Sequence, residues 1–446
     1  MKRRKFLGSS ITGMAAAGLG LGYMAAPADS SKGKIKLSSV EVPLAKKVNV
    51  IVCGGGPAGF AAAVSAARNG ATVRLIELQG FLGGVWTAGL MTHFLDASNK
   101  PGIMKEVLEL QKYGGALASQ CDVEVTKLWL ENLCLEAGVE LLYHTRIVDS
   151  IIEKGRLTAV ITENINGRQA WPADIFIDTT GNGDLAARSG CKWEMGHPET
   201  GQIQPLSLNL LVTGIRLEDL QEKKMIQMPG LSWSEPKDNL LAEVRKGGAD
   251  CSYSKPTFFA IRNDFFSLMS NHEYKVNVLD ATEITKATLR ARKEVHQQID
   301  ALRSLGGMWN NIRIIATAGQ IGIREARRIH GLYTVNIDDM IKGARFDDAV
   351  CRVTFPVDIH ALDPDKNKGV DPGFKIKPYD IPLRSLIAKD VDGLMMAGRC
   401  ISGDFFAHSS YRVTGNAVMM GEAAGTVAAK AAQDGKLPRE VEWKGY

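Results

Sequence analysis

The sequence has no Cys-x-x-Cys pair, no large excess of one charge and no apolar run long enough for a comfortable membrane span. Its seven cysteines are scattered, so their spacing supports neither a metal site nor a redox dithiol. The 54 Lys plus Arg against 49 Asp plus Glu give a formal charge of +5, and four of the positive charges stand in the run Lys2-Arg3-Arg4-Lys5. The remaining balance gives no argument for a nucleic-acid partner.

Residues 1–28 have the pattern of an export signal. The basic run leads into Phe6-Leu7, a Gly/Ala-rich apolar stretch over 11–26 and the small-x-small sequence Ala26-Pro27-Ala28. The apolar stretch is shorter than the ~20 residues that span a bilayer. Paired arginines before Phe-Leu resemble a twin-arginine signal, with a Sec signal or an uncleaved anchor as the alternatives. We expect a periplasmic or otherwise exported bacterial protein, a linker over 29–47 and no stable membrane span after cleavage.

A glycine-rich turn lies between an apolar strand and an Ala-rich helix near the start of the folded chain. The strand is expected from Val48 to Cys53, the helix over 57–69 and a second buried strand over 71–77. In a G-x-G-x-x-G turn, the glycines allow a tight bend, close approach to a pyrophosphate and helix packing. Glu77 stands about 20 residues on, where a carboxylate binds ribose hydroxyls. The pattern predicts a dinucleotide site at Gly54, Gly56, Pro57, Ala58, Gly59, Glu77 and Leu78.

This fingerprint does not by itself distinguish FAD from NAD, but three later features favour FAD. A second glycine-rich loop at 80–84 directly follows Glu77. An inserted meander is expected from short strands at 141–144, 148–152, 157–162 and 169–173, with a hairpin at Asn166-Gly167. A buried strand over 174–178 then precedes a third glycine-rich loop at 180–184. A strand over 393–397 and a helix over 416–433 return to the first pattern, and the N-terminus of that helix could face a flavin ring.

These segments predict an α/β fold with two parts. One is a Rossmann-like FAD-binding domain, a parallel sheet with an inserted β-meander, formed discontinuously by 48–195 and 382–440. The other is a mixed α+β substrate or cap domain over 196–381, where no nucleotide fingerprint occurs.

The chain also resembles the bacterial FAD-dependent oxidoreductase family of the glutathione-reductase superfold. The similar segments are 54–59, 82–89, 177–187, 323–329, 356–360, 381–386, 397–402, 407–413 and 421–425. The resemblance implies non-covalently bound FAD. Beyond the fingerprint, the expected cofactor contacts are Gly83, Gly84, Val85, Trp86, Ile147, Thr180, Gly181, Asp184, Gly398, Arg399, Gly415, Asn416 and Ala417.

Within that superfold, three features of this sequence are informative. Disulfide reductases have two cysteines shortly after the second strand, but 84–89 has none, so dithiol chemistry is not expected. There is no second G-x-G-x-x-G, which argues against a dedicated NAD(P)H domain. Many relatives have an acidic residue after the late Ala-Gly to hold the ribityl chain, whereas this chain has Arg399, so how its ribityl group is held is open.

Alcohol oxidation by a flavin requires a positioned substrate carbon and a base for the hydroxyl proton. The candidate bases are His360 and His408, each with a structural role as the alternative. Asp358 shares a face with His360 if the segment is extended, so it could orient the imidazole or cap a turn. Arg324 shares a helical face with Arg328 if 323–329 is a helix, which favours either a carboxylate or phosphate clamp or a solvated ion-pair network. Arg412 precedes the late helix and is a candidate for stabilising reduced flavin or binding substrate.

The sequence therefore predicts an FAD-dependent dehydrogenase or reductase that acts on a small polar, possibly polyhydroxylated, molecule. Its electron partner is expected to be a quinone, a redox protein or oxygen, and no metal is expected. A flavin monooxygenase or C=C reductase on the same scaffold, a non-catalytic FAD-stabilised binding protein, and a plain NAD dehydrogenase remain alternatives.

Overall fold

A parallel sheet organises the first half of the fold. The computed structural model describes residues 41–117, 119–366 and 371–445, so the predicted signal peptide and most of the linker lie outside it. The sheet is seven-stranded, and its parallel part has the order β3 (Glu140–Leu142), β2 (Val73–Ile76), β1 (Val48–Cys53), β6 (Gly167–Asp178) and β15 (Leu394–Met396). β1 is a continuous apolar run in the middle of the sheet, as expected for a strand covered on both faces.

The meander is present, but two of its predicted strands are assigned differently. β4 (Arg146–Glu153) and β5 (Arg156–Asn164) pair antiparallel, and β5 then pairs with the first half of β6. The predicted strand at 141–144 is instead the parallel edge strand β3. The predicted strands at 169–173 and 174–178 are a single strand, because the second half of β6 runs on into the parallel sheet beside β1 with no turn residue between them.

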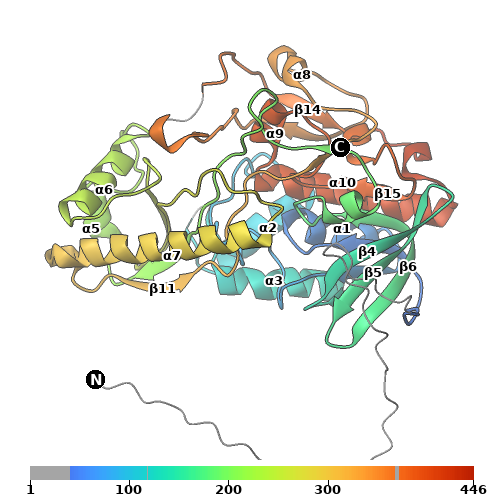
Figure 1. The fold of residues 1–446 in the computed structure, drawn as a ribbon, viewed down its shortest axis with the longest axis horizontal. Helices are drawn as coiled ribbons and strands as arrows, with labels where there is room; N and C mark the ends of the chain where they lie inside the picture. The colour runs from blue at the N-terminus through green and yellow to red at the C-terminus, as the bar shows by residue number, and fades with distance from the viewer. Residues whose placement is uncertain (1–40, 118, 367–370, 446) are drawn as a thin grey trace, which may run out of the picture. The chain divides into compact units, whose positions relative to one another are not determined.

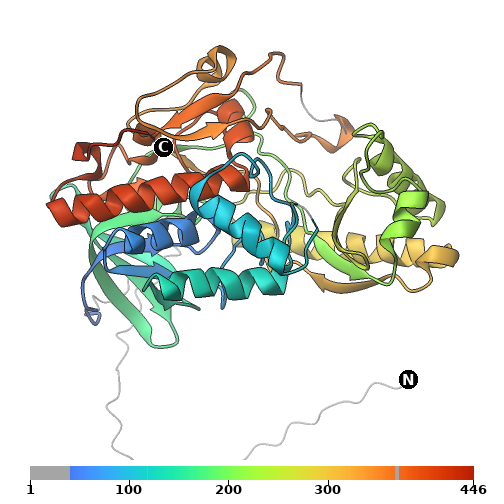
Figure 2. The same ribbon diagram turned by 180° about the vertical axis from the view of Figure 1, so that it is seen from behind.

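Two helices from opposite ends of the chain cover one face of this sheet. α1 (Pro57–Arg68) and α10 (Thr414–Asp434) lie side by side in both views (Figures 1 and 2). A Cβ on Gly421 would lie 2.1 Å from the Ala58 carbonyl oxygen, and one on Gly425 would lie 2.2 Å from that of Ala62. Only glycine allows this approach, so α10 is fixed directly above the helix of the fingerprint.

A second layer is built between residues 210 and 317. Its antiparallel sheet has the order β11 (Arg313–Thr317), β8 (Leu210–Thr213), β10 (Phe265–Met269) and β9 (Thr257–Arg262). α5 (Leu217–Glu222), α6 (Glu235–Lys246) and the long α7 (Ala281–Ser304) lie with it, at the end of Figure 1 away from β4, β5 and β6. It has an apolar core of its own, which includes Phe258, Phe266 and Trp309.

The remaining elements join these two parts. Buried residues between Ile329 and Ile381 pack in the same core as β1 and α10. The domain boundaries given above stay a prediction. Among the residues that the structure describes, none of the helices has the length and apolarity of a bilayer span. The elements not yet introduced are α2 (Gly102–Tyr113), α3 (Val123–Glu136), α4 (Asp184–Arg188), β7 (Trp193–Glu194), η1 (Gly307–Trp309), β12 (Arg328–Ile329), α8 (Ile337–Lys342), β13 (Ala349–Val353), η2 (Pro364–Lys366), β14 (Tyr379–Pro382), η3 (Leu383–Leu386), α9 (Phe405–Tyr411) and η4 (Pro438–Glu440).

Candidate cofactor groove and active site

The carboxyl ends of four parallel strands meet at one edge of the sheet. Cys53 at the end of β1 is in register with Ile76 of β2 and with Asp178 of β6, and Asp178 is in register with Met396 of β15. The loops that follow these strands therefore start side by side. They contain the predicted fingerprint, Glu77, the glycine-rich loop at 180–184 and Gly398. This edge is where open α/β sheets bind their ligands.

The fingerprint turn and the loop at 82–84 are joined backbone to backbone. Gly83 N donates to Gly55 O at 2.9 Å, and a Cβ on Gly84 would lie 2.9 Å from Gly56 Cα. A Cβ on Gly59 would lie 1.8 Å from Gly54 O, so α1 starts pressed against the first glycine. Gly56 and the N-terminus of α1 thus present backbone instead of side chains, which suits a diphosphate.

Glu77 directly follows β2 and lies beside the fingerprint turn. Its Oε2 accepts from Gly55 N at 2.6 Å and its Oε1 from Gln79 N at 2.7 Å. Burial raises the pKa of Glu77, while those two backbone N–H groups act in the opposite direction. Beside it, Leu78 is 45% exposed and Val85 37% exposed, so two apolar side chains of the predicted set are open at the groove.

The 180–184 loop is held by a buried carboxylate. Asp178 Oδ1 accepts from Thr180 N at 3.0 Å and from its hydroxyl at 2.7 Å, and Thr180 Oγ1 accepts from Asp184 N at 2.8 Å. Asp184 itself pairs with Arg327 at 2.9 Å. The loop is therefore built by its own side chains, with Gly181 at φ +77° as its left-handed residue.

Arg399 fits a diphosphate better than a ribityl hydroxyl. Its Nη2 donates to Asn182 Oδ1 at 2.8 Å, its Nη1 is buried without a partner among the described residues, and Gly181 leaves room for the guanidinium. Burial lowers the pKa of Arg399 to about 10. A buried cation with an unused donor beside two glycine loops matches the chemistry of a phosphate group. The residues present thus fit FAD, with Arg399 toward its diphosphate.

Other predicted cofactor residues have sealed side chains. Trp86 and Asn416 are 0% exposed, Ala417 is 7% and Ile147 is 8% exposed. A Cβ on Gly415 would lie 2.1 Å from Asp96 O, so the start of α10 is fixed against that turn. Contacts from these positions to a cofactor would have to come mainly from the backbone.

Asp358, His360 and Arg412 come together, as the sequence suggested for the first two. His360 Nε2 lies 3.3 Å from Asp358 Oδ2, and Arg412 Nη2 lies 3.3 Å from the same oxygen and donates to the Asp358 carbonyl at 3.0 Å. Gln204 Oε1 accepts from His360 N at 3.1 Å and from Arg412 Nη2 at 3.4 Å. The three predicted residues thus form one polar cluster, with Gln204 as a fourth member.

Burial and charge together set the protonation of this cluster. Burial lowers the pKa of His360 to about 4, and Arg324 acts in the same direction. Burial alone would raise the pKa of Asp358, but His360, Arg412 and Arg324 together bring it below its usual value. At neutral pH the cluster therefore holds a neutral imidazole beside a carboxylate.

Two further aromatic residues complete the cluster, and no sequence pattern predicted them. The His272 ring centroid lies 5.0 Å from that of His360 and 4.2 Å from that of Tyr253. His272 Nε2 is buried without a partner among the described residues. Neither residue stands in a motif, and both come from the second layer, so only the fold brings them to His360.

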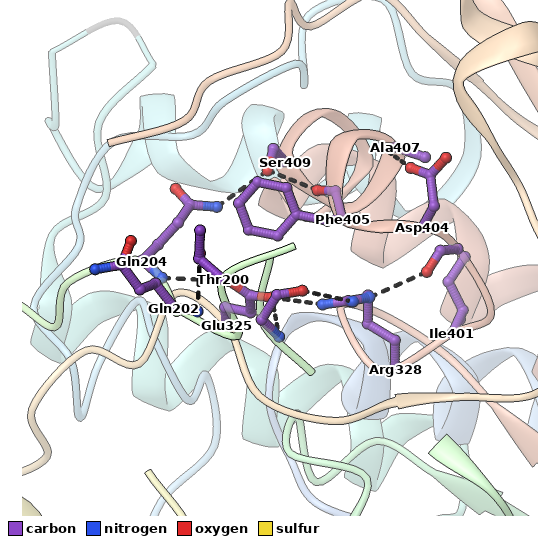
Figure 3. Close-up of polar contacts among 12 residues, drawn as sticks. Thr200, Gln202, Gln204, Glu325, Arg328, Ile401, Asp404, Phe405, Ala407 and Ser409 are labelled. Atoms are coloured by element: carbon purple, nitrogen blue, oxygen red, sulfur yellow. Dashed lines mark hydrogen bonds and ion pairs between the residues drawn. The ribbon is translucent and has the colours of Figure 1, made fainter. Parts of the chain in front are cut away.

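The segment 323–329 is not a helix, so the condition under which Arg324 and Arg328 would share a face is not met. The segment is irregular up to the short strand β12, because Glu325 turns inward. Arg328 lies 2.5 Å from Glu325 and donates to Gly196 O and Gly403 O, each at 3.1 Å. Figure 3 shows this buried pair pointing together beside Gln204, whose side chain reaches Ser409 of α9. Arg324 points elsewhere, to Pro205 O at 2.7 Å and Ser207 Oγ at 2.8 Å.

His408 does not join the cluster. It is 0% exposed, both of its ring nitrogens are without partners among the described residues, and its ring meets Tyr411 edge-on at 5.6 Å. Burial lowers its pKa well below the usual range. A direct catalytic role for His408 stays a prediction, and the geometry favours His360.

Residues 49–445 match the sequence profile of the FAD dependent oxidoreductase family. The chain belongs to this family. It is therefore an FAD-dependent enzyme with a Rossmann-like fold, as the groove geometry had indicated.

Among individual proteins, this family member is similar to a thiamine thiazole synthase of Aeropyrum pernix, with 28% identity over 41% of this chain and 70% of that protein. It is also similar to the solved structure of the flavin-dependent brominase Bmp2, with 13% identity over 90% of this chain and 81% of the other and a TM-score of 0.47. The L-proline dehydrogenase from P. horikoshii has 13% identity over 89% of this chain and 95% of the other, with a TM-score of 0.39. These similarities are too low to specify a reaction.

Proposed function

We propose that this FAD-dependent oxidoreductase is a dehydrogenase of a small polar molecule, with His360 as the base. The observation that supports it most is the buried group of His360, Asp358 and Arg412. In the forward direction a substrate C–H bond and an O–H bond break, a carbonyl forms, and the hydroxyl proton goes to His360. Bound FAD supplies the acceptor for the hydride at N5.

The geometry suits His360 to this role. With its Nε2–H donated to Asp358, the lone pair is on Nδ1. No hydrogen bond to Nδ1 occurs among the described residues, and Nδ1 is not completely enclosed by other atoms. Asp358 keeps the imidazole in this tautomer and stabilises the imidazolium that forms, as carboxylates do for catalytic histidines.

The electron acceptor and the location belong to the same proposal. The export-like N-terminus supports a periplasmic enzyme, where soluble NADH is scarce. We therefore propose a quinone, a redox protein or oxygen as the acceptor. A reductase working in the reverse direction would use the same residues.

The test is anaerobic. The exported form is purified, its flavin confirmed by absorption, and polar metabolites are screened for bleaching of the oxidised flavin band. We expect at least one to bleach the wild type, and His360→Gln to slow the bleaching by roughly 10²–10⁴-fold. His296→Gln, an exposed histidine of α7, is the matched control and should behave as wild type.

A colourless protein that cannot be reconstituted with FAD would contradict the cofactor assignment. Substrate oxygenation coupled to productive oxygen consumption would favour a monooxygenase. A flavin that no reductant or substrate bleaches would favour a non-catalytic binding protein.

A further inference from the structure

We infer that the substrate is a carboxylate and that Arg324 binds its carboxylate group. This inference rests on the proposed function and names the substrate class of the same site. It narrows the small polar substrate expected from the sequence to one that has a carboxylate group.

The partners of Arg324 are all neutral. Its Nη1 donates to Pro205 O and Ser207 Oγ, and its Nη2 lies 3.5 Å from the sulfur of Met269. Arg328, four residues further on and more deeply buried, has the carboxylate of Glu325 at 2.5 Å. Arg324 is partly buried, and a cation in such a position is costly without a close counter-charge. Arg328 therefore has a structural role, and Arg324 is left without a close anion.

One edge of the Arg324 guanidinium is free for a ligand. Nε makes no hydrogen bond among the described residues and is not completely enclosed by other atoms. Nη2 has only the thioether contact. Nε and Nη2 form the side of the guanidinium that presents two parallel N–H groups. Carboxylates bind such a fork through both oxygens, which a hydroxyl group cannot do.

The surrounding charge favours an anion as well. Arg324 and Arg412 share a single carboxylate, Asp358, while His360 is neutral at neutral pH. Lys237, 8% exposed with its ammonium 3.1 Å from the centroid of the Trp233 ring, also acts electrostatically on Asp358. One acidic group thus faces two guanidinium groups and an ammonium group, so a bound monoanion would reduce the excess positive charge of the site.

Adjacent residues of the chain contact Arg324 and the predicted base: Arg324 donates to Pro205 O at 2.7 Å, and Gln204 Oε1 accepts from His360 N at 3.1 Å. Arg324 affects the pKa values of His360, Asp358 and Tyr253, so its charge lies within electrostatic reach of all three. A small molecule with a carboxylate on Arg324 would extend its other groups toward His360. A 2-hydroxy acid carries both groups that this arrangement requires, a carboxylate for Arg324 and a neighbouring hydroxyl for the base.

Binding can be measured without turnover. The oxidised holoenzyme is titrated with glycolate, lactate and mandelate, and separately with glycolamide, lactamide and mandelamide, while shifts in the flavin absorption spectrum report binding. We expect at least one carboxylate to bind about tenfold or more tightly than its own amide, because hydrogen bonds to charged groups are stronger than neutral ones. Arg324→Met should remove this preference and leave amide binding unchanged. Arg324→Lys should keep part of it, and the exposed Arg216→Met should keep all of it.

Equal affinity for carboxylates and amides in the wild type would overturn the inference, as would an undiminished preference in Arg324→Met. If Arg324→Met loses its flavin or does not fold, Arg324→Lys decides, because wild-type affinity in that variant would contradict bidentate binding. Carboxylate binding without any bleaching would count against the dehydrogenase proposal alone.

Discussion

The buried pair of Glu325 and Arg328 gives a sharp test of what holds the backbone around Gly196, Gln204 and Gly403 in place. Glu325 is 0% exposed and accepts from Gly196 N at 2.9 Å and from Gln204 N at 3.2 Å. Arg328 is 3% exposed and donates to Gly196 O and Gly403 O. Glu325→Gln keeps the shape but leaves the Arg328 charge buried and unpaired, which costs about 3–5 kcal/mol.

That cost can be expressed as a melting temperature. An unfolding entropy of about 2.1 cal/mol/K per residue gives roughly 0.8 kcal/mol per kelvin for a unit the size of Pro43–Tyr446, so Tm should fall by about 4–6 °C. The midpoint is followed by circular dichroism and flavin release at one fixed scan rate. Arg216→Met breaks an exposed ion pair of the same i,i+3 spacing and should not change Tm measurably.

The double variant separates charge from hydrogen bonding. Glu325→Leu with Arg328→Met removes both charges, and replacing buried ion pairs by apolar residues is often neutral. Here, however, it leaves the Gly196 and Gln204 N–H groups and two carbonyls without partners, at about 1–3 kcal/mol for each group that stays unsatisfied. We therefore expect no recovery of Tm. A double variant that melts at the wild-type temperature would refute the view that this pair works mainly as a backbone clamp.

Three other changes are expected to have distinct effects. Arg399→Met should lower FAD affinity about tenfold or more, measured as flavin retained per protein and by titration of the apoprotein, whereas unchanged retention would remove Arg399 from the diphosphate. Gly425→Val should lower Tm, because its Cβ would lie 2.2 Å from Ala62 O and overpacking costs about 1–3 kcal/mol; a wild-type Tm would show that α10 can shift freely. In the pH profile of kcat/KM, activity should fall on the acidic limb as pH drops through about 4, where His360 becomes protonated. Asp358→Asn should move this acidic limb to lower pH, because the carboxylate raises the pKa of His360. A limb that does not move would exclude His360 as the titrating base.

The sequence was most informative about the groove, for a geometric reason. Parallel strands in register end at the same edge, so motifs at the ends of β1, β2, β6 and β15 had to meet there. The positions of the functional glycines could be predicted because each allows a backbone approach that a Cβ would block. Strand pairing was harder to predict, since β6 changes partners from β5 to β1 between Pro172 and Ala173 without a turn.

Only part of the candidate active site could be predicted from the sequence. Asp358 and His360 are two residues apart, so local geometry sufficed to pair them. His272 and Tyr253 reach the cluster only through packing of the second layer, and residues that meet in this way leave no local pattern. The helical face considered for Arg324 and Arg328 does not form for a related reason, because the buried contacts of Glu325 and Arg328 hold the segment in a non-helical conformation.

Three arginines show how charge accounting separates structural from functional residues. Arg328 is buried and Arg324 and Arg399 are partly buried, so negative charge or well-placed oxygens nearby stabilise each of them. Arg328 obtains both from the protein through Glu325 and two carbonyls. Arg399 obtains one amide oxygen and keeps a buried N–H unused, beside loops that suit a diphosphate. Arg324 obtains only neutral oxygens and a thioether, beside the proposed base. If the deficit at each of the last two is met by a ligand, loss of Arg399 should weaken flavin binding without changing carboxylate preference in the flavin that remains bound, and loss of Arg324 should do the reverse.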